Sequence, residues 1–422
     1  MVSSVNEIPG EAVVHEDMRG ILRAIVRGTY DLQKLRIQIG NRIVGNFRIK
    51  LGQRPGKPAS EELDADGKKI IETFKEDYKK MMDGLLGTIS YKKFRASGVI
   101  SSYAEFTLLE QYMALEKQEE VGFGRLGSIL TGYPIFTQFL SGVLGCGPRM
   151  SGVIISEFNP EDYYWTADKN GVIKNRVSPE AEGAKKHTLS PSSFWKYAGL
   201  AVMPDGLGQS RLAEHLIDLK YYDAKNKVTE RKSITFNPWL KTKLIGVLAP
   251  SFIKAGVRWQ PCSTEQYDAA PTYKRSLKMK KDPEGGKAKL TKCLLVILSP
   301  YAEKYMDYRW RLDVHPKYRD FTEAEIMKMR AEKKGTVLAA EADLPPPEDE
   351  PSLESITADE DTVEEDTNVL RENKGRKGHR HAMAMRYMVK MFLIDLYVAW
   401  RKIEGLEVRP PYSQDKLGLD PH

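Results

Sequence analysis

Cysteine is scarce in this chain. Its 422 residues include only Cys146, Cys262 and Cys293, which lie far apart and form no C-x-x-C pair. This excludes a disulfide-stapled scaffold and a paired-cysteine zinc site, and we expect no bound metal. A reducing cytoplasm is the expected compartment.

Long apolar runs are also lacking. The most apolar candidate, residues 382–400, contains Arg386, Lys390 and Asp395, which favours a buried helix over a bilayer span. The first residues show no basic-then-apolar signal segment. We therefore expect no membrane partner.

One stretch has no basic residues. Residues 341–370 contain twelve Asp or Glu and no Lys or Arg. The formal net charge of the whole chain is +7, so the rest carries +19, since 7 plus 12 is 19. That excess favours a polyanionic partner such as nucleic acid, although a solvated, salt-laced surface is the alternative. Residues 341–373 have almost no core-forming side chains and are expected to be disordered, either as a polyanion mimic or as a spacer.

The motif Gly145-Cys146-Gly147-Pro148-Arg149 lies between two apolar stretches with helical spacing. This pattern predicts a helix-hairpin-helix over residues 134–158. The glycines Gly145 and Gly147 permit positive φ and close backbone approach, and Pro148 suits the first helical position. A helix start with Arg149 beside it favours a DNA phosphate. The alternative is an ordinary helical hairpin without a ligand.

Residues 16–51 are expected to form one long helix. Ile21, Ile25, Leu32, Leu35 and Ile39 have heptad-like spacing, which suits a coiled coil and with it a homo-oligomer, or packing on one partner helix. Arg19, Arg23 and Arg27 share a face, which could follow a phosphate backbone or simply be solvated.

The predicted fold class is mainly α, with coiled-coil helices, a helix-hairpin-helix domain and small β-ribbons. Four regions are expected: a helical, coiled-coil region at 1–125, a helix-hairpin-helix domain at 126–320, a charged helix with the acidic insert at 321–378, and a closing helix and tail at 379–422. Ser102 and Glu105 form a predicted capping box. Asn170-Gly171 predicts a hairpin, a second ribbon is expected over 216–236, and residues 256–292 are expected to be basic and loop-rich.

Several stretches, in this order, resemble the bridge-RNA-guided insertion-sequence transposases. They are residues 22–36 with Asn41-Arg42, residues 145–158, Trp195-Lys-Tyr-Ala-Gly-Leu200, Asn237-Pro-Trp-Leu-Lys241, and residues 379–401. In that family a RuvC-like DEDD domain precedes a coiled coil, and a C-terminal transposase domain carries a helix-hairpin-helix and a nucleophilic serine. Here no RuvC-like carboxylates are recognisable. No cofactor is evident, and Mg²⁺ is expected only if a carboxylate site is supplied elsewhere.

The resemblance implies DNA transposition or recombination with DNA as a partner, and a guide RNA is the further partner that the resemblance suggests. The nearest candidate for the family's serine is Ser210, in Asp205-Gly-Leu-Gly-Gln-Ser-Arg211, with His215 five residues on. Arg211 could hold the phosphate, and Arg380 and Arg386 on the closing helix are further candidate DNA contacts. A turn serine making only local hydrogen bonds is the plainer interpretation of Ser210. The alternative function is a non-catalytic, structure-preferring nucleic-acid-binding protein.

Overall fold

The computed structural model divides the chain into two compact units, 1–160 and 161–422. It describes residues 14–52, 62–86, 99–271, 274–280, 289–322 and 361–411, with Glu325, Ile326 and Lys328; for 14–17, 84–86, 280 and 361–375 it describes the backbone only. The predicted charged helix at 321–334 and the acidic residues 341–360 lie largely or wholly outside these ranges.

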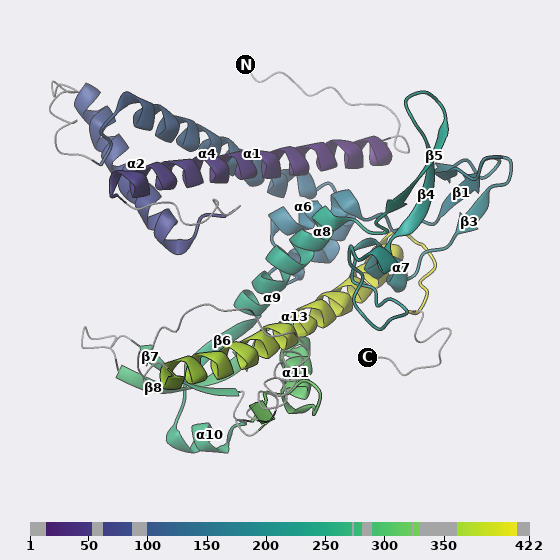
Figure 1. The fold of residues 1–422 in the computed structure, drawn as a ribbon. Helices are drawn as coiled ribbons and strands as arrows, with labels where there is room; N and C mark the ends of the chain where they lie inside the picture. The colour runs from purple at the N-terminus through teal and green to yellow at the C-terminus, as the bar shows by residue number, and fades with distance from the viewer. Residues whose placement is uncertain are drawn as a thin grey trace, which may run out of the picture. The chain divides into compact units, whose positions relative to one another are not determined.

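The first unit is helical (Figure 1). Its elements are α1 (Val14–Lys50), α2 (Ala65–Leu86), α4 (Tyr103–Leu130), α5 (Pro134–Gln138), the short 3₁₀ turn η1 (Leu140–Gly142) and α6 (Pro148–Glu157). Helix α1 runs along α4 and also packs against α6. The predicted capping box is confirmed: the Ser102 hydroxyl accepts the Glu105 N–H, and the Glu105 carboxylate accepts the Ser102 N–H.

The buried stripe of α1 differs from the predicted heptad. Ile21 and Leu35 are 56% and 49% exposed, whereas Leu22, Val26 and Tyr30 are buried. The stripe therefore follows ordinary 3.6-residue periodicity toward α4 and α6 of the same chain. A coiled coil with a second copy is not seen in this arrangement and stays a prediction.

A buried carboxylate fixes the pairing of α1 with α4. Glu119 on α4 is 5% exposed. It accepts a hydrogen bond from Gln33 at 2.7 Å and one from Arg36 at 2.6 Å, and Arg36 also donates to the Tyr112 hydroxyl at 2.8 Å. Because a buried charge is tolerated only when it is paired and hydrogen-bonded, this cluster specifies the register of the two helices.

The second unit carries three small antiparallel sheets. The strands are β1 (Tyr163–Ala167), β2 (Ile173–Val177) and β3 (Lys185–His187), ordered β2-β1-β3; β4 (Ile217–Tyr222) and β5 (Val228–Ser233), paired as a ribbon; and β6 (Val257–Pro261), β7 (Arg275–Lys280) and β8 (Lys289–Ile297), ordered β6-β8-β7. The predicted hairpin at Asn170-Gly171 is confirmed, with Gly171 at φ +77°, and so is the ribbon over 216–236.

The helices of this unit enclose its core. They are α7 (Pro191–Tyr197), the 3₁₀ turn η2 (Ala213–His215), α8 (Pro238–Lys243), the π-helical turn η3 (Leu244–Leu248), α9 (Ala249–Gly256), α10 (Thr264–Ala269), α11 (Pro300–Val314) and α13 (Asp361–Ile403). Figure 1 shows α13 running beside α11 and α9, and the rings of Phe252, Tyr301 and Phe392 join these three helices at centroid separations of 5.0–5.4 Å.

The mainly helical class with small antiparallel sheets is confirmed, but several boundaries move. The predicted boundary at residue 125 falls inside α4, because α6 packs on α1 and α4 and the first unit extends to residue 160. Residues 256–292, expected as loops, contribute most of the β6-β8-β7 sheet, whose short basic strands give little alternation in the sequence. Helix α13 begins at Asp361, so residues 361–373 are helical rather than disordered; carboxylates in a first turn favour a helix start.

Candidate functional site

The Gly145 to Arg149 segment opens α6 but only partly as predicted. Gly145 has φ +93°, whereas Gly147 is extended at φ −72° and a Cβ there would meet nothing within 4 Å. Pro148 occupies the first turn as expected. The amides of Met150 and Ser151 already donate to the Gly147 carbonyl. The expectation of positive φ and close approach at Gly147 is therefore wrong.

The element before this segment is also not a regular helix. After α5 the chain passes through the single 3₁₀ turn η1 before it reaches Gly145. Arg149 is exposed, and its guanidinium lies 4.0 Å from the centroid of the Phe123 ring on α4. A helix-hairpin-helix motif is thus not shown, and phosphate binding by Arg149 stays a prediction.

Two of the three arginines predicted to share a face of α1 meet the end of α6. Arg23 Nε donates to the Ser156 carbonyl at 2.9 Å. Arg27 donates to both oxygens of the Glu157 carboxylate, at 2.9 and 3.1 Å, and the Glu157 side chain is 1% exposed. These contacts give Arg23 and Arg27 a structural role, since the pairing compensates a buried charge. Arg19 is half-buried.

Arg380 is an interior residue rather than a DNA-facing one. It is 3% exposed, and it donates to the Tyr318 carbonyl at 2.6 Å and to Asp320 at 2.9 Å. Its Nε lies 2.5 Å from Asp313 Oδ1, an ion pair without hydrogen-bond alignment. A guanidinium enclosed in this way has no face left for a phosphate, so the prediction for Arg380 is corrected.

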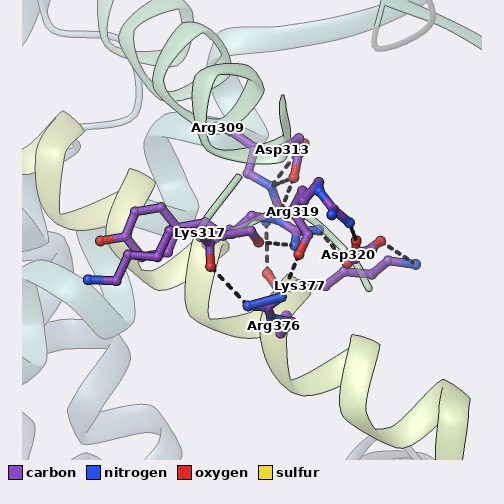
Figure 2. A network of polar contacts seen from close by, with 9 residues as sticks. Arg309, Asp313, Lys317, Arg319, Asp320, Arg376 and Lys377 are labelled. Atoms are coloured by element: carbon purple, nitrogen blue, oxygen red, sulfur yellow. Dashed lines mark hydrogen bonds and ion pairs between the residues drawn. The ribbon is translucent and has the colours of Figure 1, made fainter. Parts of the chain in front are cut away.

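Figure 2 shows polar contacts among residues of α11, the loop that follows it and α13. Arg376 on α13 donates to the carbonyls of Arg319 and Lys317, at 2.8 and 2.9 Å, and Arg309 on α11 pairs with Asp313 at 3.1 Å. These contacts tie the end of α11 and the following loop to α13. The network holds helices together.

Ser210 lies in a relay of three side chains. Ser210 Oγ is 2.8 Å from His215 Nδ1, and His215 Nε2 is 2.8 Å from Asp205 Oδ2. The Ser210 amide also donates to Nδ1, at 3.1 Å. Nδ1 must therefore be the unprotonated, accepting nitrogen, and Nε2 carries the proton given to Asp205. The serine hydroxyl is thus free to donate its proton toward a base.

The three members of the relay differ in exposure. His215 is 2% exposed, Ser210 is half-buried and the Asp205 side chain is 40% exposed. Hydrogen bonds from His215 and from the Leu207 amide hold the pKa of Asp205 below its usual range. Asp205 is thus ionised at neutral pH and orients the buried imidazole.

Two of the stretches that carry the family resemblance, residues 195–200 and 237–241, lie together near Ser210. The Asn237 amide donates to the Tyr197 carbonyl at 2.8 Å. Lys241 Nζ donates to the Gln209 carbonyl at 2.6 Å, directly before Ser210. Gly199 has φ +70° and a Cβ there would lie 2.5 Å from the Phe236 ring, which explains the glycine in Tyr197-Ala-Gly199.

Helix α13 adds Arg386 to the same place, and Lys390 follows one helical turn later. A Cβ at Gly208 would lie 3.9 Å from Arg386 Nη1, and the Trp195 indole donates to the Lys390 carbonyl at 3.1 Å. Burial lowers the pKa of both Lys241 and Lys390, and the charge of Arg386 lowers them further. We call Ser210, His215, Asp205, Lys241, Arg386 and Lys390 the serine site. Arg211 beside it is exposed.

Lys241 and Lys390 were missed as site residues from sequence, although one signal was present. A lysine inside residues 382–400, the most apolar stretch of the chain, needs a reason, and Lys390 is such a residue. In the parts of the chain that the structure describes, no group of three or more His, Cys, Asp or Glu side chains is arranged to hold a metal ion. None of the described helices is long and apolar enough to cross a membrane. Comparison with protein-family models, curated proteins and solved structures gave no match.

Proposed function

We propose that the chain is a DNA-binding protein of DNA transposition or recombination in which Ser210 is the nucleophile. The observation that carries this proposal is the Ser210–His215–Asp205 relay, with Lys241 and Arg386 reaching the residues just before Ser210. Serine is a weak nucleophile unless a neighbouring base takes its proton, and His215 Nδ1 is positioned for that role. The basic excess outside residues 341–370 supports a nucleic-acid substrate.

The proposed step is a phosphoryl transfer. Ser210 Oγ attacks the phosphorus of a DNA diester while its proton passes to His215 Nδ1. The P–O bond to one sugar breaks, and that sugar oxygen takes a proton from solvent water and leaves as a free hydroxyl. The His215 imidazolium afterwards returns its proton to solvent, so the protons balance. Asp205 stabilises the imidazolium that forms, and neighbouring cations stabilise the added charge on the phosphoryl oxygens. The DNA strand remains attached to Ser210 as a phosphoserine diester until a second hydroxyl displaces it.

A second candidate function rests on a different feature of the same loop. The Leu212 amide donates to Ser210 Oγ at 3.2 Å, so the relay also closes a hydrogen-bonded turn. A non-catalytic protein that prefers particular nucleic-acid structures would use the relay only to shape this loop. A guide RNA would be a further partner under either function.

The two functions are separated by a search for the covalent intermediate. The full chain is incubated with supercoiled plasmid DNA and Mg²⁺, the reaction is stopped with detergent, and the DNA is digested to nucleotides. Mass spectrometry should then find a nucleotide on the peptide that contains Ser210, and Ser210→Ala should abolish it. A protein that binds this DNA without any nucleotide on Ser210 would favour the non-catalytic function.

A further inference from the structure

The three cations of the serine site come from two elements. Lys241 lies on α8, and Arg386 and Lys390 are one helical turn apart on α13. Arg386 is exposed, whereas Lys241 and Lys390 are half-buried. Lys241 and Arg386 therefore meet at the residues that precede Ser210, and Lys390 adds a third positive charge one helical turn from Arg386.

No carboxylate compensates these charges within the described part of the chain. Lys241 donates to the carbonyl of Gln209, and Lys390 Nζ lies 5.4 Å from the centroid of the Trp195 ring. No ion pair involves Arg386 in the same residues. The two lysines thus remain near a like charge with only neutral contacts.

Two other enclosed cations of this unit have carboxylate partners. Arg401 is 2% exposed and pairs with Asp162 at 3.0 Å, and Arg380 meets both Asp313 and Asp320. At the serine site no described residue supplies a carboxylate, and a bound anion would supply the missing negative charge.

The residues just before Ser210 indicate where a bound anion would lie. Gln209 is 1% exposed, and its side-chain Oε1 has no hydrogen-bond partner. Its Nε2 lies 2.5 Å from Thr235 Oγ1, so an exchange of the amide atoms would let Thr235 donate to oxygen and leave an amide donor unpaired. Arg386 reaches Gly208 and Lys241 reaches Gln209, so an anion held by both lies next to Ser210.

We propose that Lys241, Arg386 and Lys390 together bind one phosphate group of a nucleic-acid strand beside Ser210. This inference rests on the proposed function for its ligand class. A guanidinium supplies forked hydrogen bonds to two phosphate oxygens, and the ammonium groups supply point charges. All three cations serve the same phosphate, which distinguishes this site from a generally basic surface.

The test uses fluorescence anisotropy with a labelled 30-nucleotide duplex and the matching single strand. Lys241→Met, Arg386→Met and Lys390→Met are measured singly and together, with Lys402→Met as the matched control. Lys402 is exposed and lies on the same helix, about 18 Å beyond Lys390. Each site variant should bind roughly tenfold more weakly, as expected for the loss of a charged hydrogen bond, and the control should bind as the parent does.

The salt dependence tests whether one phosphate is shared. On the duplex, the triple variant should lower the slope of log affinity against log salt by about 0.9, the value for one phosphate. A decrease of about 2.7 in this slope, three times that value, would overturn the proposal, because each cation would then hold its own phosphate. Unchanged affinity in folded variants would also overturn it.

A labelling experiment on the parent protein avoids dependence on variants that fail to fold. Acetic anhydride is applied with and without the single-stranded oligonucleotide, and modified lysines are quantified by mass spectrometry. DNA should lower the labelling of Lys241 and Lys390 but not that of Lys402. If DNA leaves the labelling of Lys241 and Lys390 unchanged, the site is contradicted. If protection and the slope change occur without a nucleotide on Ser210, the phosphate site stands and the proposed chemistry fails. If the Ser210 adduct forms but DNA protects neither lysine, the proposed chemistry stands and the phosphate site fails.

Discussion

Replacement of Arg380 by methionine should destabilise the second unit without acting on a DNA contact. Arg380 is 3% exposed and bonds to the Tyr318 carbonyl and to Asp313 and Asp320. Breaking a buried ion pair typically costs about 3–5 kcal/mol. Here both carboxylates are more than a third exposed and keep Arg309 and Lys377 as partners, so we expect about 2–3 kcal/mol.

The assay is thermal unfolding followed by circular dichroism. For a unit of this size, the expected loss lowers the melting temperature by about 5–10 °C. Lys377→Met is the matched control, because it removes the same charge from the same helix. Lys377 is exposed, and its Nζ lies 3.6 Å from Asp320 Oδ2. The control should lie within about 0.5 kcal/mol of the parent.

Two results would refute this reasoning. An Arg380→Met variant that melts with the parent would show that the network in Figure 2 contributes little to folding. A variant of normal stability with weakened DNA binding would restore Arg380 as a DNA contact.

Three further predictions concern other parts of the chain. Burial raises the pKa of Cys146 to about 12, so at pH 8 iodoacetamide should label the half-buried Cys262 well before Cys146, as read by mass spectrometry; rapid labelling of Cys146 in folded protein would contradict its enclosure. Arg149→Ala should weaken binding to all DNA sequences alike, because phosphate contacts carry no base information, and unchanged affinity by anisotropy would make its contact with Phe123 its whole role. Converting the eight Asp and Glu of residues 341–360 to amides should tighten DNA binding more at low salt than at high salt, since salt screens their repulsion of DNA; equal affinity at low salt would indicate a spacer.

Local signals in the sequence predicted the parts of the fold that depend on neighbouring residues. The Ser102–Glu105 capping box and the Asn170-Gly171 turn are formed by residues within three positions of each other, and both are present. The register of α1 was not predictable in the same way. Both Ile21 and Leu22 are apolar, and only packing against α4 and α6 decides which one is buried.

The candidate site was predicted in part for the same reason. Ser210 and His215 are close in sequence, and a turn brings them into contact. Lys241 and Arg386 reach that turn from helices far along the chain, and only the tertiary fold places them there. Arg380 and Arg386 looked equivalent in sequence, yet six positions along a helix place one in the interior and one at the surface.

The central claim is that Ser210 attacks a DNA phosphodiester, and the covalent adduct tests it most directly. The parent chain, Ser210→Ala and His215→Gln are compared after incubation with supercoiled DNA, with bound DNA confirmed for all three by anisotropy. We expect a nucleotide on the Ser210 peptide in the parent, none in Ser210→Ala, and a strongly reduced amount in His215→Gln, because the general base contributes about 10²–10⁴-fold. Tight DNA binding by the parent with no nucleotide on Ser210 would contradict it.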